Sequence, residues 1–136
     1  MQINPYLSFN GQCEAAFKFY HTCLGGNIPM SLTYESSPMC DKTPPEMRNK
    51  IMHTRLVVGD MVLMGSDSPA EHYEAPKGFH VTLNFDKPEE AERIYKLLSE
   101  KGTVQMELQE TFWAHRFAMF ADQFGIPWMI NCEKAA

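Results

Sequence analysis

The residues best placed to do chemistry are polar side chains that alternate with apolar ones along two short segments. From Phe79 to Phe85 every second residue is polar, and the same alternation starts at Ile3. Strict alternation indicates a strand with one apolar and one polar face. The candidate site residues on these polar faces are Asn4, Tyr6 and Ser8 in the first segment and His80, Thr82 and Asn84 in the second.

His80 is the candidate catalytic residue. Histidine titrates near neutral pH, so a general-base role requires no unusual surroundings. His53, in the apolar segment 51–58, is a second imidazole that can lie beside it. A structural role for an isolated histidine is the alternative. The chain has no G-x-S-x-G elbow, cysteine–histidine signature, paired-carboxylate motif or Gly-rich phosphate loop, so no nucleotide cofactor is expected.

Aromatic residues gather near the C-terminal end of the sequence. One interpretation is that they form the core and a dimer interface. The other is that they form the wall of a pocket for an apolar or aromatic ligand. The 10 Met of the chain favour such a pocket, because methionine-rich surfaces adapt to varied shapes. The members are Trp113, Phe117, Phe120, Phe124 and Trp128.

The elements that must position these residues follow from periodicity. In the first half we expect a strand over 3–9, a helix over 13–24 closed by Gly25-Gly26, and strands over 30–35, 51–58 and 61–65. Gly59-Asp60 is a two-residue hairpin signal, and the Pro-containing segment 36–49 is a long loop. The helix stripe to be buried is Cys13, Ala16, Phe17, Tyr20 and Leu24.

The second half repeats this order after a polar loop over 67–78. We expect a strand over 79–85, a helix capped by Asp86, and strands over 104–108, 114–121 and 128–132, the last two around the turn 122–125. The buried helix stripe is Ala91, Ile94, Tyr95 and Leu98.

A shift of 76 residues aligns the two halves, 3–34 with 79–110, and gives seven identities in 32 positions, where about two are expected by chance. The matches fall at strand, helix start, helix end and next strand, which favours an internal duplication. They are Leu7/Leu83, Phe9/Phe85, Glu14/Glu90, Ala15/Ala91, Gly26/Gly102, Met30/Met106 and Leu32/Leu108.

A duplicated β-α-β-β-β module has a physical consequence for the site. One helix covers one face of each small sheet, so the apolar residues from Ile3 and Phe79 onward should pack beneath the helices. The polar faces, with Tyr6, His80 and Thr82, are then expected to line one cavity shared by modules 1–66 and 79–136 of a single domain. Exposure of these residues to solvent on open sheets is the alternative.

Segments near both ends of the chain resemble a known family. Phe9–Tyr20 (FNGQCEAAFKFY), followed by Leu24-Gly25-Gly26, is similar to the opening of PhnB-like proteins. Trp113–Phe117 and Asp122–Trp128 are similar to the W-x-x-R-[FY] and D-x-F-G-x-x-W patterns of that branch. The branch belongs to the vicinal-oxygen-chelate superfamily of glyoxalase I, bleomycin-resistance proteins and extradiol dioxygenases. The resemblance spans essentially the whole chain and implies an α+β fold of curved, mostly antiparallel sheets around a central cavity.

The resemblance also implies where a divalent metal would bind, on the first and fourth strands of each module. The matching positions here are Asn4 or Pro5, Leu63 or Met64, His80, and Trp128 or Met129. Only His80 is a good donor for such an ion, so we expect no tightly bound metal. Arg116, at the motif position, is expected to flank His80 and bind an anionic ligand group through its planar guanidinium.

Composition limits the partners and the compartment. The 136 residues carry 12 Lys and Arg against 17 Asp and Glu, a net charge of −5 that disfavours nucleic-acid binding. The absence of a signal peptide and of a long apolar run, together with four widely spaced cysteines, indicates a cytoplasmic protein with reduced thiols and no membrane contact. Edge strands and the loop 36–49 favour a homodimer.

These observations predict a small-molecule-binding protein with a degenerate metal site. The first alternative is a metal-dependent lyase, isomerase or dioxygenase of the same superfamily that uses His80. A methyltransferase of the ubiquinone pathway, a label given to members of this branch, is a weaker alternative, because nothing in the sequence indicates a methyl-donor site. A dimeric scaffold without a ligand is the third.

Overall fold

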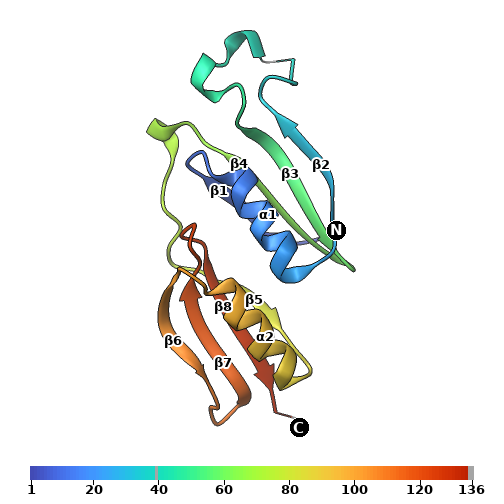
Figure 1. The fold of residues 1–136 in the computed structure, drawn as a ribbon, viewed down its shortest axis with the longest axis vertical. Helices are drawn as coiled ribbons and strands as arrows, with labels where there is room; N and C mark the ends of the chain where they lie inside the picture. Colours follow the sequence, from blue (N-terminus) through green and yellow to red (C-terminus); the bar gives the residue numbers. More distant parts are fainter. Residues whose placement is uncertain (39, 135–136) are drawn as a thin grey trace. The chain divides into compact units, whose positions relative to one another are not determined.

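One helix and four strands recur in each half of the chain, in the order that the repeat predicts (Figure 1). The computed structural model describes residues 1–38 and 40–134; Met39, inside the predicted loop, lies outside the described residues. The chain divides into two compact units, Met1–Glu74 and Ala75–Ala136, with the division inside the predicted linker 67–78. No helix of the described residues is long and apolar enough to span a membrane.

The N-terminal unit is a four-stranded mixed sheet with one helix. Its sheet has the order β1-β4-β3-β2, in which β1 and β4 are parallel and the other neighbours antiparallel. Two short 3-10 helices, Cys40–Lys42 and Pro45–Met47, occupy the predicted loop. The main elements are β1 (Tyr6–Phe9), α1 (Cys13–Leu24), β2 (Asn27–Thr33), β3 (Ile51–Val58) and β4 (Met61–Asp67).

The C-terminal unit has the same topology, β5-β8-β7-β6. Leu7 of β1 lies beside Gly65 of β4, and its repeat equivalent Leu83 of β5 lies beside Ile130 of β8. The predicted α+β fold of two repeated modules is therefore confirmed. The elements are β5 (Val81–Asn84), α2 (Pro88–Leu98), β6 (Thr103–Gln109), β7 (Ala114–Ala121) and β8 (Pro127–Glu133).

The repeated glycine pair Gly26/Gly102 has a steric cause. A Cβ atom on Gly26 would collide with the carbonyl oxygen of Val57, and one on Gly102 with that of Ala121. Each glycine lies just after its helix, where the chain returns to the sheet. The close approach of two backbones at this point therefore requires glycine in both modules.

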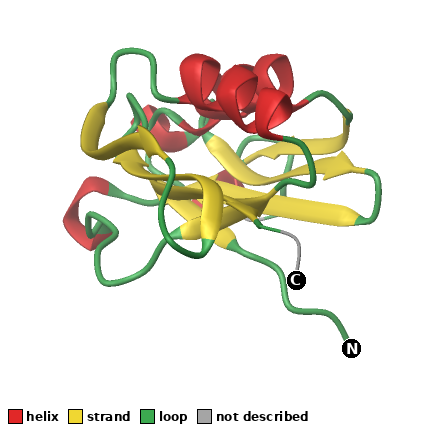
Figure 2. Cartoon of the chain, turned by 90° about the horizontal axis from the view of Figure 1, so that it is seen from below, coloured by secondary structure: helices red, strands yellow, loops and turns green. Residues whose placement is uncertain are grey.

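Each helix covers one face of its own sheet (Figures 1 and 2). α1 packs on β3 and β4, and α2 packs on β7 and β8. Leu7 and Phe9 of the sheet are buried with Phe17 of α1, and Phe120 and Trp128 of the second sheet are buried with Ile94 of α2. In the predicted helix stripes, Leu24 and Tyr95 are only partly buried, and Cys23 is the buried residue near the end of α1.

The predicted ends of two strands are wrong. Ile3 is 93% exposed and Phe79 is 48% exposed, whereas both were expected under a helix. β1 begins only at Tyr6 and β5 only at Val81, so neither residue belongs to a strand. The alternation of apolar and polar residues extends beyond the residues that pair with a neighbouring strand. Without that pairing, it does not determine which side of the sheet a residue faces.

The predicted cap and one predicted strand also differ. Asp86 does not cap α2, because the residue before the helix is the extended Lys87 and no side chain caps its amides. Pro88 occupies the first turn instead. β6 is largely exposed rather than half-buried, because it is an edge strand outside the strands that α2 covers.

Asp67 joins three elements of the N-terminal unit. Its carboxylate, 1% exposed at the end of β4, accepts the backbone N–H of Cys13 and that of Ile51, both at 2.9 Å. The first bond fixes the start of α1 and the second the start of β3. A carboxylate at a helix N-terminus is also favoured by the helix dipole.

We predict that Asp67→Ala lowers the free energy of unfolding by about 3 kcal/mol, because two buried N–H groups lose their acceptor. Asp86→Ala, which also removes an aspartate ahead of a helix, should cost less than about 0.5 kcal/mol. Urea unfolding of both variants measures the difference. Equal effects of the two substitutions would contradict this role of Asp67.

Candidate functional site

The side of each sheet opposite its helix carries most of the predicted site residues; we call it the open face. In the N-terminal unit, Tyr6 lies beside Met64, Met64 beside Arg55, and Arg55 beside Met30. Residues paired across a sheet share a face. This row crosses β1, β4, β3 and β2 and defines the open face of that unit.

Tyr6 and His53 meet on this open face. The Tyr6 hydroxyl and Nδ1 of His53 share a hydrogen bond of 3.2 Å, and the ring centroids are 5.7 Å apart. The pair joins β1 to β3 across β4. A phenol and an imidazole in contact can donate or accept a proton at a bound molecule.

The other candidates of the first strand are less closely held. Ser8 is exposed and lies beside Ser66 of β4. Asn4 precedes β1, and its side-chain amide donates only to Gln2, at 3.4 Å. Ser8 therefore belongs to the open face, whereas Asn4 lies before the strand.

Arg55 is a residue that the sequence analysis missed. It lies two positions after His53 on β3, on the same face, and its side chain forms no hydrogen bond or ion pair with a described residue. Its Nε is buried without an acceptor. The signal was present in the sequence, because an arginine two residues from a candidate histidine in a strand shares its face.

In the C-terminal unit, His80 lies one residue before β5. Its Nε2 and the amide oxygen of Gln105, on β6, are 3.3 Å apart. Thr82 lies beside Met129 of β8, and Met129 beside Met119 of β7. Thr82 therefore belongs to a face rich in thioethers, whereas His80 lies just before the paired residues and contacts Gln105 of β6. The expectation that Tyr6, His80 and Thr82 share one cavity concerns residues of both units, and it stays a prediction.

Trp113 lies at the end of this methionine-rich surface. Its ring contacts Phe112 and Phe117, with centroids 4.9 and 5.2 Å away. Phe117 lies beside Asn131 on the open-face side of β7. Trp113 and Phe112 remain exposed at 41% and 90%, so this aromatic group offers apolar surface to a ligand or partner.

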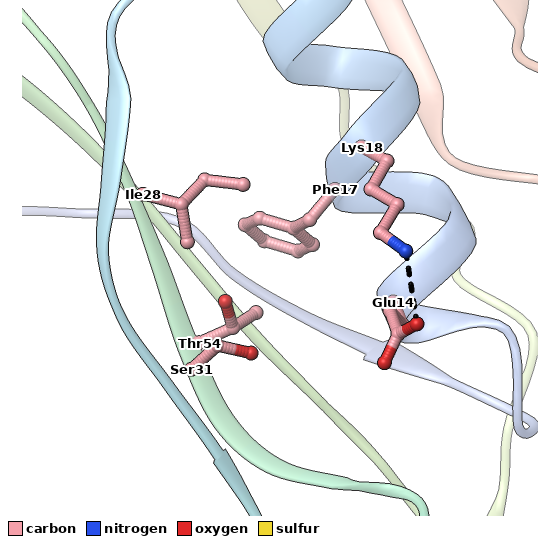
Figure 3. Close-up of a pocket in the computed structure, with 6 residues that line it drawn as sticks. All are labelled: Glu14, Phe17, Lys18, Ile28, Ser31 and Thr54. Carbon is pink, nitrogen blue, oxygen red and sulfur yellow. Dashed lines mark hydrogen bonds and ion pairs between the residues drawn. The ribbon is translucent and has the colours of Figure 1, made fainter.

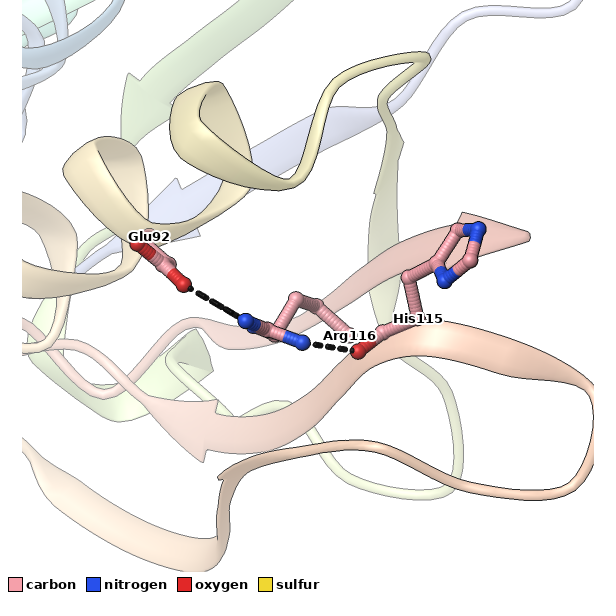
Figure 4. A network of polar contacts seen from close by, with 3 residues as sticks. All are labelled: Glu92, His115 and Arg116. Atoms are coloured by element: carbon pink, nitrogen blue, oxygen red, sulfur yellow. Dashed lines mark hydrogen bonds and ion pairs between the residues drawn. The ribbon is translucent and has the colours of Figure 1, made fainter. Parts of the chain in front are cut away.

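Arg116 lies on the side of the sheet that α2 covers. Its guanidinium binds the carboxylate of Glu92, on α2, at 2.9 Å, and its Nη1 donates to the carbonyl of His115 (Figure 4). A register irregularity of β7 lies between Ala114 and Arg116. The expectation that Arg116 flanks His80 on the same face is therefore wrong, and its charge is already neutralised.

Trp128 is a core residue. It is 1% exposed, on the helix-covered side of β8, and its indole N–H donates to Asp122 at 2.8 Å. The same carboxylate accepts the backbone N–H groups of Phe124 and Ile126. The D-x-F-G-x-x-W motif thus builds the turn between β7 and β8, which gives Trp128 a structural role.

The residues at the metal positions of the resemblance do not fit a divalent ion. Met64 and Met129 occupy the open face, whereas Leu63 and Trp128 lie under the helices. With Asn4 and His80, the donors are two thioethers, one amide and one imidazole, a poor set for hard or borderline ions. Within residues 1–38 and 40–134, no group of three or more His, Cys, Asp or Glu is arranged to hold a metal.

The surroundings of two buried cysteines do not favour the reactive thiolate. Cys13 has no exposed surface, as predicted, and burial, with a smaller effect of the Asp67 charge, raises the pKa of its thiol. Burial likewise raises the pKa of Cys132. A neutral thiol is a weak nucleophile, so both residues serve packing.

A shallow pocket of about 280 Å³ lies on the helix-covered side of the N-terminal unit (Figure 3). Its mouth carries the ion pair of Lys18 with Glu14, at 3.1 Å. The hydroxyl of Thr54 donates to the carbonyl of Met30. None of the predicted site residues lines it; its walls are Glu14, Phe17, Lys18, Ile28, Ser31 and Thr54.

Comparison with known proteins finds similar sequences and structures. The chain is 32% identical over 142 residues to Protein YjdN of Escherichia coli (strain K12), covering 98% of this chain and 97% of that protein. It is 48% identical to protein PA1353 from Pseudomonas aeruginosa, with a TM-score of 0.90 and 99% of both chains covered. The PhnB protein from Bacillus cereus, described as a putative 3-demethylubiquinone-9 3-methyltransferase, has a TM-score of 0.81 at 19% identity, covering 97% of this chain and 99% of that one.

The family resemblance seen in the sequence is confirmed. The profile of the Glyoxalase/Bleomycin resistance protein/Dioxygenase superfamily matches residues 2–130, almost the whole chain. The two repeated modules are the architecture that this resemblance implies. The chain therefore belongs to the glyoxalase/bleomycin resistance/dioxygenase superfamily, in its PhnB-like branch.

Proposed function

We propose that this protein binds a small organic molecule on the open faces of its sheets, without a tightly bound divalent metal. The main support for the proposal is the identity of the open-face residues on the last strand of each module, β4 and β8. Met64 and Met129 stand there, where the superfamily's metal enzymes require oxygen or nitrogen donors. Their thioethers leave His80 as the one good donor among the four positions.

The composition of the open faces suits an organic ligand. Thioethers and the aromatic group around Trp113 offer adaptable apolar surface. Tyr6 and His53 add polar groups in the N-terminal unit, and His80 adds one in the C-terminal unit. Small-molecule sites combine these two features, a mainly apolar lining with a small number of placed polar groups.

We predict that protein purified without chelator, through a tag that contains no histidine, carries far less than one equivalent of Ni, Zn, Fe, Mn or Co. Elemental analysis by mass spectrometry measures this. His72→Ala, in an exposed 3-10 turn, is the matched control for His80→Ala. Near-stoichiometric metal that His80→Ala removes and His72→Ala retains would contradict the proposal and favour a metal-dependent enzyme.

We also predict that a thermal-shift screen with EDTA present finds stabilising compounds, and that His80→Ala weakens their binding with little loss of stability. The cost should stay below about 1 kcal/mol, because the contact of His80 with Gln105 is exposed. Leu83→Ala, half-buried on the helix-covered side beside Ile130, should cost about 2 kcal/mol through lost apolar burial.

Two outcomes of this comparison would count against the proposal. If His80→Ala destabilises the protein as much as Leu83→Ala, His80 is a structural residue and not part of a binding surface. If no compound stabilises the wild-type protein with EDTA but some do after addition of a divalent metal, the metal-independent site is wrong.

A further inference from the structure

The open face of the N-terminal unit carries a cation that no described group neutralises. Arg55 lies in the middle of β3, between Met64 of β4 and Met30 of β2. The ion pairs of the described residues involve Lys18, Arg93, Arg116 and Lys134, and none involves Arg55. No hydrogen bond from its guanidinium to a described residue is present either.

A guanidinium without an acceptor lowers the stability of the fold unless a bound molecule pairs with it. Nε of Arg55 is buried with no acceptor, and buried polar groups in folded proteins are nearly always paired. Because Nε is covered by protein atoms, an outside molecule would reach the guanidinium through its terminal nitrogens, Nη1 and Nη2. A planar pair of N–H donors matches the two oxygens of a carboxylate or phosphate.

The neighbouring side chains on this face are donors or apolar groups. Tyr6 and His53, joined by their hydrogen bond, lie on the same face as Arg55, and His53 is two residues away on the same strand. No residue in the paired open-face positions of this sheet is acidic. These positions hold Tyr6, Ser8, Asn27, Met30, Leu32, His53, Arg55, Val57, Val62, Met64 and Ser66.

We propose that Arg55, with Tyr6 and His53 beside it, binds an oxyanion group of the ligand, a carboxylate or a phosphate. This inference rests on the proposed function and deepens it by naming the ligand class. The net charge of −5 does not oppose it, because salt screens distant charges beyond about 8 Å while a direct pair with Arg55 is not screened in this way.

Calorimetric titration with three small aromatic probes tests the proposal: benzoate, phenyl phosphate and the neutral benzamide. We expect at least one of the two anions to bind and benzamide to bind at least about 10-fold more weakly. The anion that binds more tightly distinguishes a carboxylate site from a phosphate site. Arg55→Gln should weaken anion binding by about 10-fold or more.

Two controls keep this result interpretable. Arg93→Gln removes an exposed arginine of α2 that pairs with Glu90 and should leave anion binding unchanged. Arg55→Lys keeps the charge and loses the planar donor pair, so it should bind the anion with intermediate affinity even if Arg55→Gln folds poorly.

Three results would overturn the proposal. The first is equal binding of benzamide and the anions. The second is unchanged anion binding in both Arg55 variants. The third is failure of both anions to bind at about 10 mM while neutral compounds from the thermal-shift screen do bind, which would leave the proposed function intact. If no compound of any charge binds, the proposed function itself fails.

Discussion

A single helix covers one face of each four-stranded sheet, and this constraint determines what the rest of the molecule can do. α1 reaches β3 and β4, and α2 reaches β7 and β8. Side chains on the covered faces, such as Phe9 and Trp128, fill a core, so they are unavailable to a ligand. The opposite faces keep polar and thioether side chains that the core does not require. The proposed binding surface and the core that stabilises the fold thus use opposite sides of the same strands.

The side of the strand explains why two arginines on equivalent strands, Arg55 on β3 and Arg116 on β7, have different surroundings. Arg116 lies on the covered side, where Glu92 neutralises it. Arg55 lies on the open side, where no described carboxylate does. In the same way, two buried aspartates are structural: Asp67 fixes the start of α1, and Asp122 of the D-x-F-G-x-x-W motif holds the turn before β8. The residues that identify the family are thus mostly those that build the fold.

Periodicity and the internal repeat predict most of the architecture, including the bounds of α1 and β7, because burial of one face imposes a period on the sequence. They fail where local geometry changes the side on which a residue lies. Ile3 and Phe79 precede the first paired residue of their strands, and an irregularity beside Arg116 interrupts the alternation of β7. Arg55 could have been found from its spacing to His53, but its lack of a partner is visible only in three dimensions.

The central claim, metal-independent binding at the open faces, is tested most directly by methyl NMR of protein labelled at methionine, with a compound library and EDTA present. Met64 and Met129 report on the two open faces, and Met61, exposed at the hairpin tip, is the internal control. We predict that bound compounds shift the resonance of Met64 or Met129 and leave that of Met61 unchanged. Shifts that appear only after a divalent metal is added would contradict it.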